Sequence, residues 1–303
     1  MVQRFDSVLA AAHEACAAQD HPQACLYVLA TPIGNLADIG LRALHVLSLV
    51  DALACEDTRH SQALLRGYGI DKPAHAFLAL HQHNEHSAAE QVIVRLQRGE
   101  RVAYLSDAGT PAISDPGARL VAGVQDAGFR VVPIPGVSSV TAVLSVSGCQ
   151  GDGSFVFLGF LPSKSTERQH AIQTMSQENR AQVFLEAPHR IQALANDVGA
   201  LGEREISVGR ELTKQFEEVA RMKAQDFPSW LQANPHRSRG EFAMVLHPQV
   251  VSNDKAHHAG DALLDMLLAE LPVKTAVKLA AQISGESRNA LYERALQKKQ
   301  APT

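Results

Sequence analysis

Long apolar runs are absent from this 303-residue chain, since no stretch approaches the roughly 18 apolar residues that span a bilayer. The first twenty residues, MVQRFDSVLAAAHEACAAQD, carry acids and a histidine within an apolar pattern. This pattern differs from that of a secretory signal peptide and favours an amphipathic helix or extension. Cysteine is scarce too, and Cys16, Cys25, Cys55 and Cys149 show neither metal-ligand nor redox spacing. We therefore expect reduced thiols in a cytoplasmic protein without a membrane partner.

Motifs of several large enzyme classes are also missing. The chain has no G-x-G-x-x-G or G-x-x-x-x-G-K-[ST] spacing, which argues against a Rossmann dinucleotide site and a phosphate loop. It has no G-x-S-x-G and no Ser/His/Asp spacing that would support acyl transfer. Internal repeats and low-complexity segments are absent.

Charge is distributed unevenly along the chain. From Leu271 to the end there are six Lys or Arg against two Glu, whereas the whole chain has a formal charge of -4. The body before this tail is therefore acidic. A basic tail on an acidic body suggests a polyanionic partner, although solvated helix faces produce the same pattern.

The first half alternates short β-rich runs with helical patterns. Buried strands are predicted at 26–30, 51–55, 102–105 and 130–134. Helices are predicted at 36–50 and at 87–99, the second with Ser87 as N-cap and Gly99 as its stop. Strands separated by single helices indicate βαβ units and a mainly parallel sheet.

A second series follows a break at Pro135 and Gly136, where Ser138 can cap a helix of small residues. Strands are predicted at 154–160, 182–186, 206–210 and 241–246, with a helix at 189–201, and short helices at 274–283 and 288–296 flank a turn at 284–287. At about 100–200 residues per domain, the length fits two or three domains. The expected fold is α/β: an extension (1–25), two α/β domains with mainly parallel or mixed sheets (26–135 and 136–247), a linker (248–262) and a small helical domain (263–303).

The loop 106-SDAGTPAISDPG-117 directly follows a predicted strand. Gly109 and Gly117 permit positive φ and close backbone approach, and two prolines stiffen the loop. Ligands bind outside the carboxyl ends of strands in parallel α/β sheets, so Asp107 and Asp115 are candidate ligand contacts. Both aspartates can instead form Asx turns or helix caps.

Two further loops follow predicted strands. The segment 31-TPIGNL-36 makes a tight turn, and 56-EDTRHSQALL-65 places Glu56, Asp57 and Arg59 at a strand end where a helix opens. Helix capping by Asp57 with a surface Arg59 is the alternative interpretation.

Two charged clusters remain open to more than one interpretation. The cluster 81-HQHNEH-86 has zinc-like spacing, but fourteen histidines make chance clustering the simpler explanation, and Asn84 and Glu85 are then free to face a cleft. In 210-RELTKQFEE-218, helical spacing puts Glu211, Lys214 and Glu218 on one face and Thr213 and Glu217 on the next. This predicts either a solvated, ion-paired helix or a source of a base or anion clamp.

Eight motifs then stand in a recognisable order: 27-YVLATPIGNLADI-39, 56-EDTR-59, 105-LSDAGTPAISDPG-117, 135-PGVSSVTAVLSVSG-148, 157-FLGFLP-162, 185-LEAPHR-190, 210-RELTK-214 and 240-GEF-242. In this order they resemble the tetrapyrrole methylase superfamily, and most closely its branch that methylates a cytidine ribose 2′-hydroxyl in 16S ribosomal RNA. The match covers about residues 26–246, and the C-terminal helix pair is similar to that branch's small extra domain. Members that modify tetrapyrroles carry G-D-P where this chain has S-D-A-G-T-P, which argues against a porphyrinoid substrate.

The resemblance implies S-adenosylmethionine (SAM) as methyl donor, bound between two α/β domains, and a homodimer that acts on ribosomal RNA of the small subunit. No metal is expected, because neither the cysteines nor the histidine cluster provides a convincing set of ligands. Carried over by position, the residues against SAM are Pro32, Asp107, Ala108, Gly109, Thr110, Ile113, Ser138 and Thr141, with Leu185 and Ala243 near the adenine. These positions suit the ligand, because adenine needs an apolar slot and methionine needs backbone partners.

A ribose hydroxyl is a weak nucleophile, so transfer depends mainly on positioning, with a base adding to it. Glu56 and Glu186 are the candidate acceptors, and Arg59 and Lys214 are candidates for orienting phosphate or ribose. Candidate RNA contacts are Arg59, Arg190, Lys214, Lys274, Lys278, Arg288 and Arg294. The tail helices can also serve in dimer packing. A methylase of a tetrapyrrole or another small substrate, and a non-catalytic RNA-binding assembly factor, are the alternative functions.

Overall fold

The structure, a computed structural model, describes residues 6–81, 84–114, 116–249, 263–284 and 287–300. The chain divides into two compact units, Met1–Pro248 and Gln249–Thr303. No helix within the described residues is both long enough and apolar enough to cross a membrane.

The first unit begins with a five-stranded parallel sheet. Its strands run in the order β3-β2-β4-β1-β5. Their bounds are β1 (Cys25–Leu29), β2 (Ala52–Cys55), β3 (Phe77–Ala79), β4 (Arg101–Leu105) and β5 (Arg130–Ile134). Successive side chains of a strand pack into hydrophobic cores on opposite faces of the sheet. Tyr27 and Leu29 pack on one face, and Leu26 packs on the other. The three central strands, β1, β2 and β4, are buried on both faces, which explains why they are almost entirely apolar.

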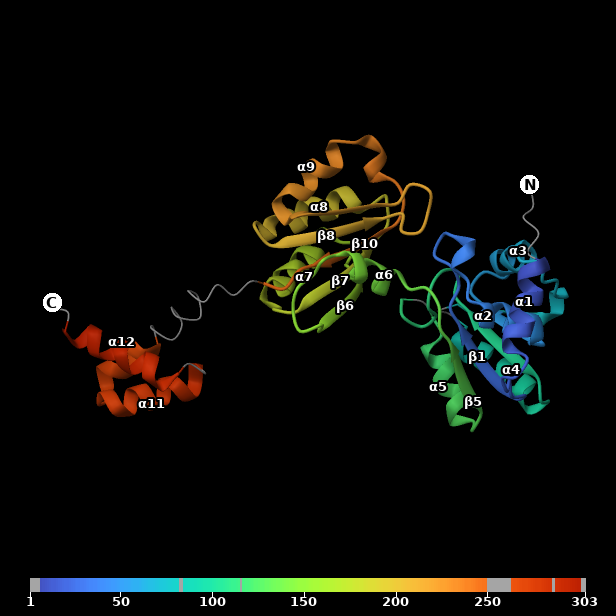
Figure 1. Cartoon of the computed structure of the whole chain (residues 1–303), viewed down its shortest axis with the longest axis horizontal. Coiled ribbons are helices and arrows are strands. Elements are labelled where there is room, and N and C mark those ends of the chain that lie inside the picture. The colour runs from blue at the N-terminus through green and yellow to red at the C-terminus, as the bar shows by residue number, and fades with distance from the viewer. Residues whose placement is uncertain (1–5, 82–83, 115, 250–262, 285–286, 301–303) are drawn as a thin grey trace. The chain divides into compact units, whose positions relative to one another are not determined.

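Helices cover both faces of this sheet (Figure 1). One face packs against α1 (Asp6–Cys16), α2 (Leu41–Leu49) and α3 (Thr58–Gly67). The other face packs against α4 (Glu85–Gln97) and α5 (Ala118–Asp126). The N-terminal segment predicted to be amphipathic therefore contributes a helix, α1, whose Ala12 and Cys16 are buried.

A second sheet of mixed direction follows in the same unit. Its order is β6-β7-β10-β8-β9, and only β6 and β7 run parallel. Its strands are β6 (Phe155–Phe160), β7 (Ala181–Glu186), β8 (Glu205–Arg210), β9 (Glu218–Lys223) and β10 (Phe242–Leu246). One face packs against α7 (Ser165–Gln177), α8 (Ile191–Val198) and α9 (Phe227–Gln232), and the other against α6 (Ser139–Val146). The prediction of two α/β sheets, parallel and mixed, is confirmed.

The second unit is helical. Residues 263–270 form a helix, followed by α11 (Val273–Ser284) and α12 (Arg288–Gln300). Leu264, Val277 and Leu291 are buried in its small core. Both predicted helices are present, and the helix at 263–270 was not predicted. Most of the predicted linker, residues 250–262, lies outside the described residues. Short 3-10 helices occur in the first unit at Leu36–Asp38, Ala74–Ala76, Gly199–Leu201, Ala224–Asp226 and Pro235–Ser238.

Two predicted helix starts differ from the structure, and a third helix starts as predicted but lacks its capping bond. The helix expected over 36–50 is broken at Gly40, whose extended backbone separates the Leu36–Asp38 turn from α2. Helix α4 starts after Asn84 rather than at Ser87, whose hydroxyl donates to the Asn84 carbonyl at 3.1 Å. Ser138 occupies the N-cap position of α6, but its side chain makes no capping hydrogen bond.

Two edge strands were missed. Strand β3 has only three residues, too few for a periodic pattern, and β9 overlaps the segment whose charge spacing predicted a helix. Both lie at sheet edges, where one neighbouring strand suffices to form them.

Gly117, which ends the loop after β4, has a backbone conformation that excludes other residues. Its φ is 130°, and a Cβ there would overlap the ring of Tyr104. The Tyr104 hydroxyl donates to the Pro116 carbonyl, and the Gly117 amide donates to Glu85 Oε1 at 3.1 Å. The ring therefore lies directly beneath the start of α5.

We expect Gly117→Ala to lower the melting temperature well beyond Gly99→Ala. Gly99 also has positive φ (83°), but a Cβ there meets no atom within 4 Å. Gly99→Ala therefore measures only the strain of the left-handed backbone, which costs about 1–2 kcal/mol and lowers the melting temperature by about 2–8 °C. Gly117→Ala adds the Tyr104 overlap. Thermal melts followed by circular dichroism measure the difference, and equal losses would contradict the overlap.

Candidate active site

The carboxyl ends of the central strands of the first sheet form a crevice. Strands β1 and β4 are neighbours, but β1 leads into α2 on one face and β4 leads into α5 on the other. Adjacent strands whose connections leave on opposite faces open a ligand crevice at their carboxyl ends. Loops 31–36 and 106–117 begin there, as the sequence predicted.

Backbone hydrogen bonds join these two loops. The Thr31 amide donates to the Gly109 carbonyl at 2.9 Å, and the Gly109 amide donates to the Thr31 carbonyl at 3.0 Å. The buried Ser106 hydroxyl lies 3.1 Å from the same Gly109 carbonyl. Gly109 has φ 82°, which glycine adopts without strain. The stiff loop predicted from its composition is thus held by its neighbour.

The loop also contacts the start of the second half of the unit. Thr110 Oγ1 donates to the Val137 carbonyl at 3.1 Å. Gly136 lies against Ala30, because a Cβ at Gly136 would come within 3.0 Å of the Ala30 Cβ. Residues 135–138 are therefore fixed beside the ends of β1 and β4.

A cavity of about 310 Å³ opens beside this loop, within the usual size range for small-molecule sites. Both sheets contribute to it: Ile33 and Gly109 lie on one side, and Leu185, Leu212 and Ala243 on the other. Of the ten residues expected against SAM, seven line the cavity: Ala108, Gly109, Thr110, Ile113, Ser138, Leu185 and Ala243.

Three expected SAM contacts do not line the cavity. Pro32 is buried next to Ile33, which lines the cavity instead. Asp107 Oδ1 accepts a hydrogen bond from the Asp57 amide at 3.2 Å, so it joins two loops. The Thr141 hydroxyl donates to the Ser138 carbonyl within α6 at 3.2 Å. Asp115 lies outside the described residues.

Glu186, at the end of β7, is the acidic group best placed for chemistry. Its side chain is fully buried (0% exposed) and it lines the cavity. Oε1 accepts from the Ala187 amide at 2.8 Å and lies 3.0 Å from Arg190 Nε. Oε2 is buried and accepts no hydrogen bond from any described residue. A buried acceptor left without a donor is costly, and a ligand with a suitable donor removes that cost.

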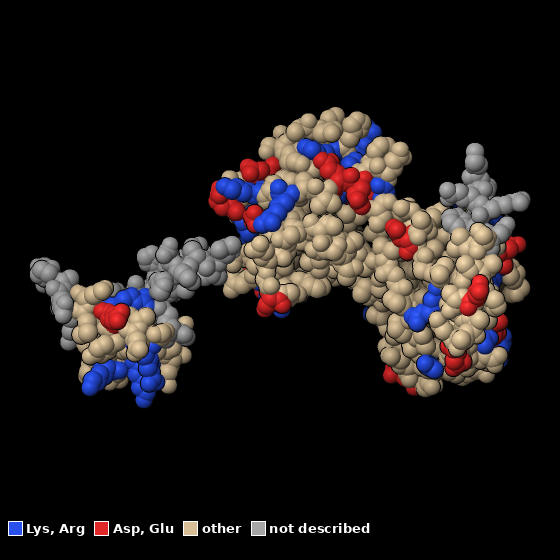
Figure 2. Space-filling view, viewed as in Figure 1, with Lys and Arg blue, Asp and Glu red and all other residues tan. Residues whose placement is uncertain are grey.

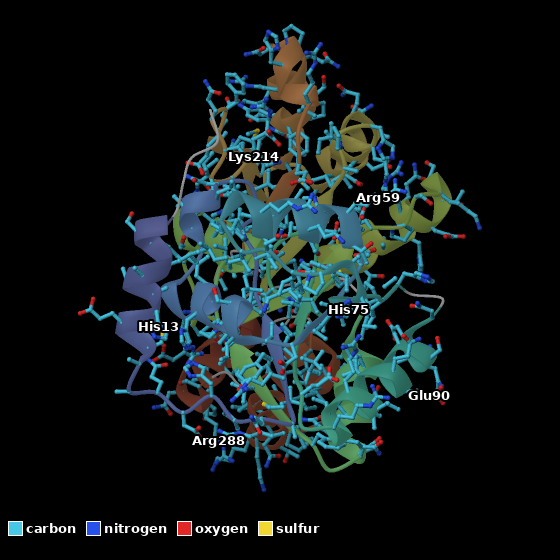
Figure 3. All side chains as sticks on the ribbon, turned by 90° about the vertical axis from the view of Figure 1, so that its right-hand side faces the viewer. His13, Arg59, His75, Glu90, Lys214 and Arg288 are labelled. Carbon is cyan, nitrogen blue, oxygen red and sulfur yellow. The ribbon has the colours of Figure 1, made fainter. Side chains whose placement is uncertain are left out.

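Glu56 and Arg59 lie elsewhere. Both are exposed at the end of β2 and the start of α3, and neither lines the cavity. Asp57 Oδ1 accepts from the amides of Arg59 (2.8 Å) and His60 (3.2 Å), so Asp57 caps α3 as the alternative interpretation proposed. These amide bonds lower the pKa of Asp57. In Figure 3, Arg59 and Lys214 belong to separate elements, α3 and the loop after β8.

The helix predicted at 210–218 is wrong. Strand β8 ends at Arg210, a turn follows, and β9 begins at Glu218. Glu211 and Thr213 have φ of 51° and 67°, which a right-handed α-helix excludes. The turn is held locally, because the Thr213 amide donates to Glu217 Oε2 at 2.6 Å and the Lys214 amide to the Glu211 carbonyl at 3.0 Å. Charged residues that have helical spacing in the sequence therefore stabilise a turn in the structure.

The remaining basic candidates are dispersed. Arg190 is partly buried, and its guanidinium donates to the Leu161 carbonyl. Lys274, Lys278 and Arg288 are exposed on α11 and α12, and Arg288 is labelled in Figure 3. Arg294 is partly buried, with Nε 3.4 Å from the Ala290 carbonyl.

Among the described residues, no group of three or more His, Cys, Asp or Glu is arranged to hold a metal. Residues 82–83 of the histidine cluster lie outside the described residues. Asn84 donates to the Ala79 carbonyl and Glu85 accepts from Gly117, so neither lines the cavity.

Sequence reasoning missed several cavity residues, among them Ile33, Phe160, Leu212 and Glu241. Each lies within or beside a motif that was recognised. The available signal was their position at a strand end or within a few residues of one, where neighbouring side chains share one crevice.

Comparison with known proteins identifies the family. Residues 25–228 match the family described as Tetrapyrrole (Corrin/Porphyrin) Methylases. The chain belongs to this family. Residues 254–299 match a domain described as the RsmI C-terminal HTH domain, which falls in the helical unit.

The family's curated relatives extend over nearly the whole chain. The chain is 42% identical over 272 residues to the ribosomal RNA small subunit methyltransferase I of Haemophilus influenzae, covering 88% of this chain and 95% of the relative. It is 44% identical over 277 residues to the protein of the same name from Pseudomonas aeruginosa, covering 90% and 97%. The resemblance inferred from the eight motifs is confirmed.

Solved structures share the fold. A cobalt precorrin-4 methyltransferase aligns with TM-score 0.54 and 16% identity, covering 74% of this chain and 95% of that one. A diphthine synthase also aligns with TM-score 0.54, at 14% identity, covering 74% and 89%. At these identities the likeness concerns the fold alone.

The chain is therefore a methyltransferase, and its donor is SAM. SAM supplies an electrophilic methyl group on a sulfonium centre. The cavity fits such a ligand, because Leu185 and Ala243 form an apolar wall while the loop at Gly109 presents backbone. The buried Oε2 of Glu186 adds an acceptor to which no residue in the described part of the chain donates a hydrogen bond.

We expect Ala243→Leu to weaken SAM binding by about tenfold or more, since overfilling a packed site costs about 1–3 kcal/mol. Ala243 is 4% exposed and pairs directly with Leu185 across β10 and β7. Calorimetric titration with SAM measures the change. Ala220→Leu on β9, outside the cavity lining, is the matched control. Equal affinity in both folded variants would exclude Ala243 from the SAM site.

Proposed function

We propose that this enzyme methylates the ribose 2′-hydroxyl of a cytidine in 16S ribosomal RNA of the small ribosomal subunit. The observation that carries the proposal is the name shared by relatives 42–44% identical over about 90% of the chain, ribosomal RNA small subunit methyltransferase I. The choice of a cytidine ribose rests on the motif resemblance described under Sequence analysis.

In this reaction a C–O bond forms to the ribose 2′-oxygen, the bond from the methyl carbon to sulfur breaks, and the hydroxyl loses its proton. Positioning of the two reactants supplies most of the acceleration, about 7–11 kcal/mol in well-oriented systems. Of the two candidate acceptors, Glu186 is the one that lines the cavity, and no described residue donates a hydrogen bond to its Oε2. We assign Glu186 the task of accepting the hydroxyl hydrogen bond, and its proton as the bond forms.

The helical unit is proposed to contact RNA. Lys274 and Lys278 lie one turn apart on α11, and Arg288 begins α12, so their exposed charges suit phosphate contacts. The match to a helix-turn-helix domain supports the same role. Arg59, on the exposed start of α3, is the corresponding candidate in the first unit. Action on ribosomal RNA is consistent with a cytoplasmic location.

A homodimer is proposed through the edge of the second sheet. Phe155 and Leu158 on the edge strand β6, and Val146 at the end of α6, are 42%, 36% and 53% exposed. The surface over β6 and α6 is almost free of charged side chains in Figure 2. Light scattering after gel filtration tests this, and a monomer at micromolar concentration would refute it.

Two alternatives predict different products. A small-substrate methylase labels a tetrapyrrole, and a non-catalytic assembly factor binds RNA without methyl transfer. Incubation with labelled SAM and either immature small subunits or precorrin-type substrates separates them. Mass-spectrometric mapping should place the label on a cytidine ribose of 16S ribosomal RNA. Label on a tetrapyrrole alone, or RNA binding without transfer, would overturn the proposal.

We expect Glu186→Gln to lower kcat by about 10- to 100-fold while the Kd for SAM changes little, since a positioned base contributes up to ~10²–10⁴ and positioning remains. Glutamine keeps the volume and the Ala187 bond, and a thermal melt verifies folding. Glu56→Gln, at an exposed strand end, is the control and should retain wild-type kcat. Loss of kcat in the control alone would transfer the role to Glu56.

RNA affinity should fall steeply with salt, and Lys274→Ala/Lys278→Ala should flatten the plot of log K against log salt by about 1–2 units, about 0.7–0.9 per lost phosphate contact. Filter binding from 50 to 200 mM KCl measures the slope. Lys164→Ala, which removes an exposed lysine paired with Glu167 at 3.0 Å, should leave the slope unchanged. An unaltered slope in the double variant would show that α11 does not contact phosphate, and would favour a role of this helix in dimer packing.

A further inference from the structure

One lysine connects the two halves of the first unit. Lys214 belongs to the loop between β8 and β9, yet its aliphatic stem lies on Gly34 in the loop after β1. A Cβ at Gly34 would overlap Lys214 Cγ and lie 2.8 Å from Cε. The two loops approach each other in Figure 1. A side chain at position 34 would therefore displace the stem of a residue about 180 positions later.

The ammonium of Lys214 has two carboxylate partners. Nζ lies 2.9 Å from Glu211 Oε1 and 3.0 Å from Glu241 Oε2. Burial opposes the charged form, but hydrogen bonds to both carboxylates outweigh it and raise the pKa of Lys214. The ammonium thus stays protonated, and its charge is balanced within the protein. This arrangement differs from a free phosphate contact.

Backbone bonds extend the connection to β10. The Glu211 amide donates to the Glu241 carbonyl at 2.9 Å, and the Glu241 amide donates to Glu211 Oε1 at 3.0 Å. Gly240 has φ 88°, and a Cβ there would overlap Glu211. The turn after β8 and the start of β10 are thereby held together around the Lys214 ammonium.

Each segment held by Lys214 also supplies a wall of the cavity. Ile33 precedes Gly34, Leu212 follows Glu211, and Glu241 itself lines the cavity. Ile33 comes from the first sheet's loops but packs in the core around α6 and β10 of the second sheet. A shift of Lys214 would move cavity walls on both sides.

We propose that Lys214 is a positioning residue that sets the spacing of the two halves across the SAM cavity, with its stem seating loop 31–36 and its ammonium tethering Glu211 and Glu241. The proposal rests on the assignment of this cavity to SAM. It gives Lys214 a role in donor affinity and alignment in place of contact with RNA.

A double-variant cycle on the full chain tests the contact between Gly34 and Lys214. Gly34→Ala and Lys214→Ala should each weaken SAM binding by about tenfold, because small displacements of positioning groups cost up to ~10². In the Lys214→Ala background the lysine stem is gone, so a Cβ at position 34 no longer meets it. Gly34→Ala should then weaken SAM binding by at most about twofold. Such coupling is expected only for residues in contact. Additive effects of the two substitutions would overturn the proposal.

Lys214→Met separates the stem from the charge. It should keep the packing on Gly34 but release Glu211 and Glu241, so SAM affinity should lie between wild type and Lys214→Ala. Hydrogen exchange of the amides in 31–36 should quicken in Lys214→Ala and stay slow in Lys214→Met. Equal exchange in the two variants would contradict the assignment of the stem.

Lys223→Ala is the matched control, since Lys223, at the end of β9, also pairs with a glutamate, Glu203, and neither residue lines the cavity. It should leave the Kd for SAM unchanged. If the Lys214 variants melt at a lower temperature but bind SAM with wild-type affinity, the ion pairs of Lys214 serve only the stability of the fold. If the wild-type chain failed to bind SAM, the cavity assignment and this proposal would both fall, whereas unaffected variants would overturn this proposal alone.

Discussion

The pair of backbone hydrogen bonds between Thr31 and Gly109 is the constraint on which the site depends. These bonds join the loops after two neighbouring strands, β1 and β4, whose connections leave on opposite faces of the sheet. Because backbone bonds carry no side-chain requirement, the loops are free to present glycine, alanine and threonine to a ligand at short range. The second sheet then needs only to place its strand ends opposite this pair.

The second sheet does so with a different connectivity. Strands β7 and β10 run antiparallel, which brings Leu185 and Ala243 side by side at one end. The apolar wall of the cavity is thus a cross-strand pair, while Glu186, the next residue on β7, is buried and forms an ion pair with the partly buried Arg190. The end of β7 therefore provides both part of the apolar cavity wall and a hydrogen-bond acceptor. This division fits a donor whose large part is bound by packing and whose reacting end is positioned by a few polar groups.

Much of the fold could be predicted, because burial imposes local patterns. The central strands of the first sheet begin and end within two residues of their predicted positions, since their residues must be apolar on both faces. The errors occur where local pattern and tertiary contact compete. Glu211, Lys214 and Glu218 have helical spacing, but Glu211 is bonded to Glu241, thirty residues away, and adopts positive φ. Strand β3 is too short to carry a pattern.

By itself, the sequence determined the alternation of strands and helices, the stiffness and position of loop 106–117, and the order of motifs that defines the family. These are properties of neighbouring residues, so they survive without coordinates. The tertiary structure alone decided which of several plausible polar residues reach the cavity. It placed Glu186 there and left Glu56 outside, gave Asp107 a partner in the loop after β2, and brought Lys214 onto Gly34. Each of these outcomes depends on partners distant along the chain, and spacing within a segment does not encode them.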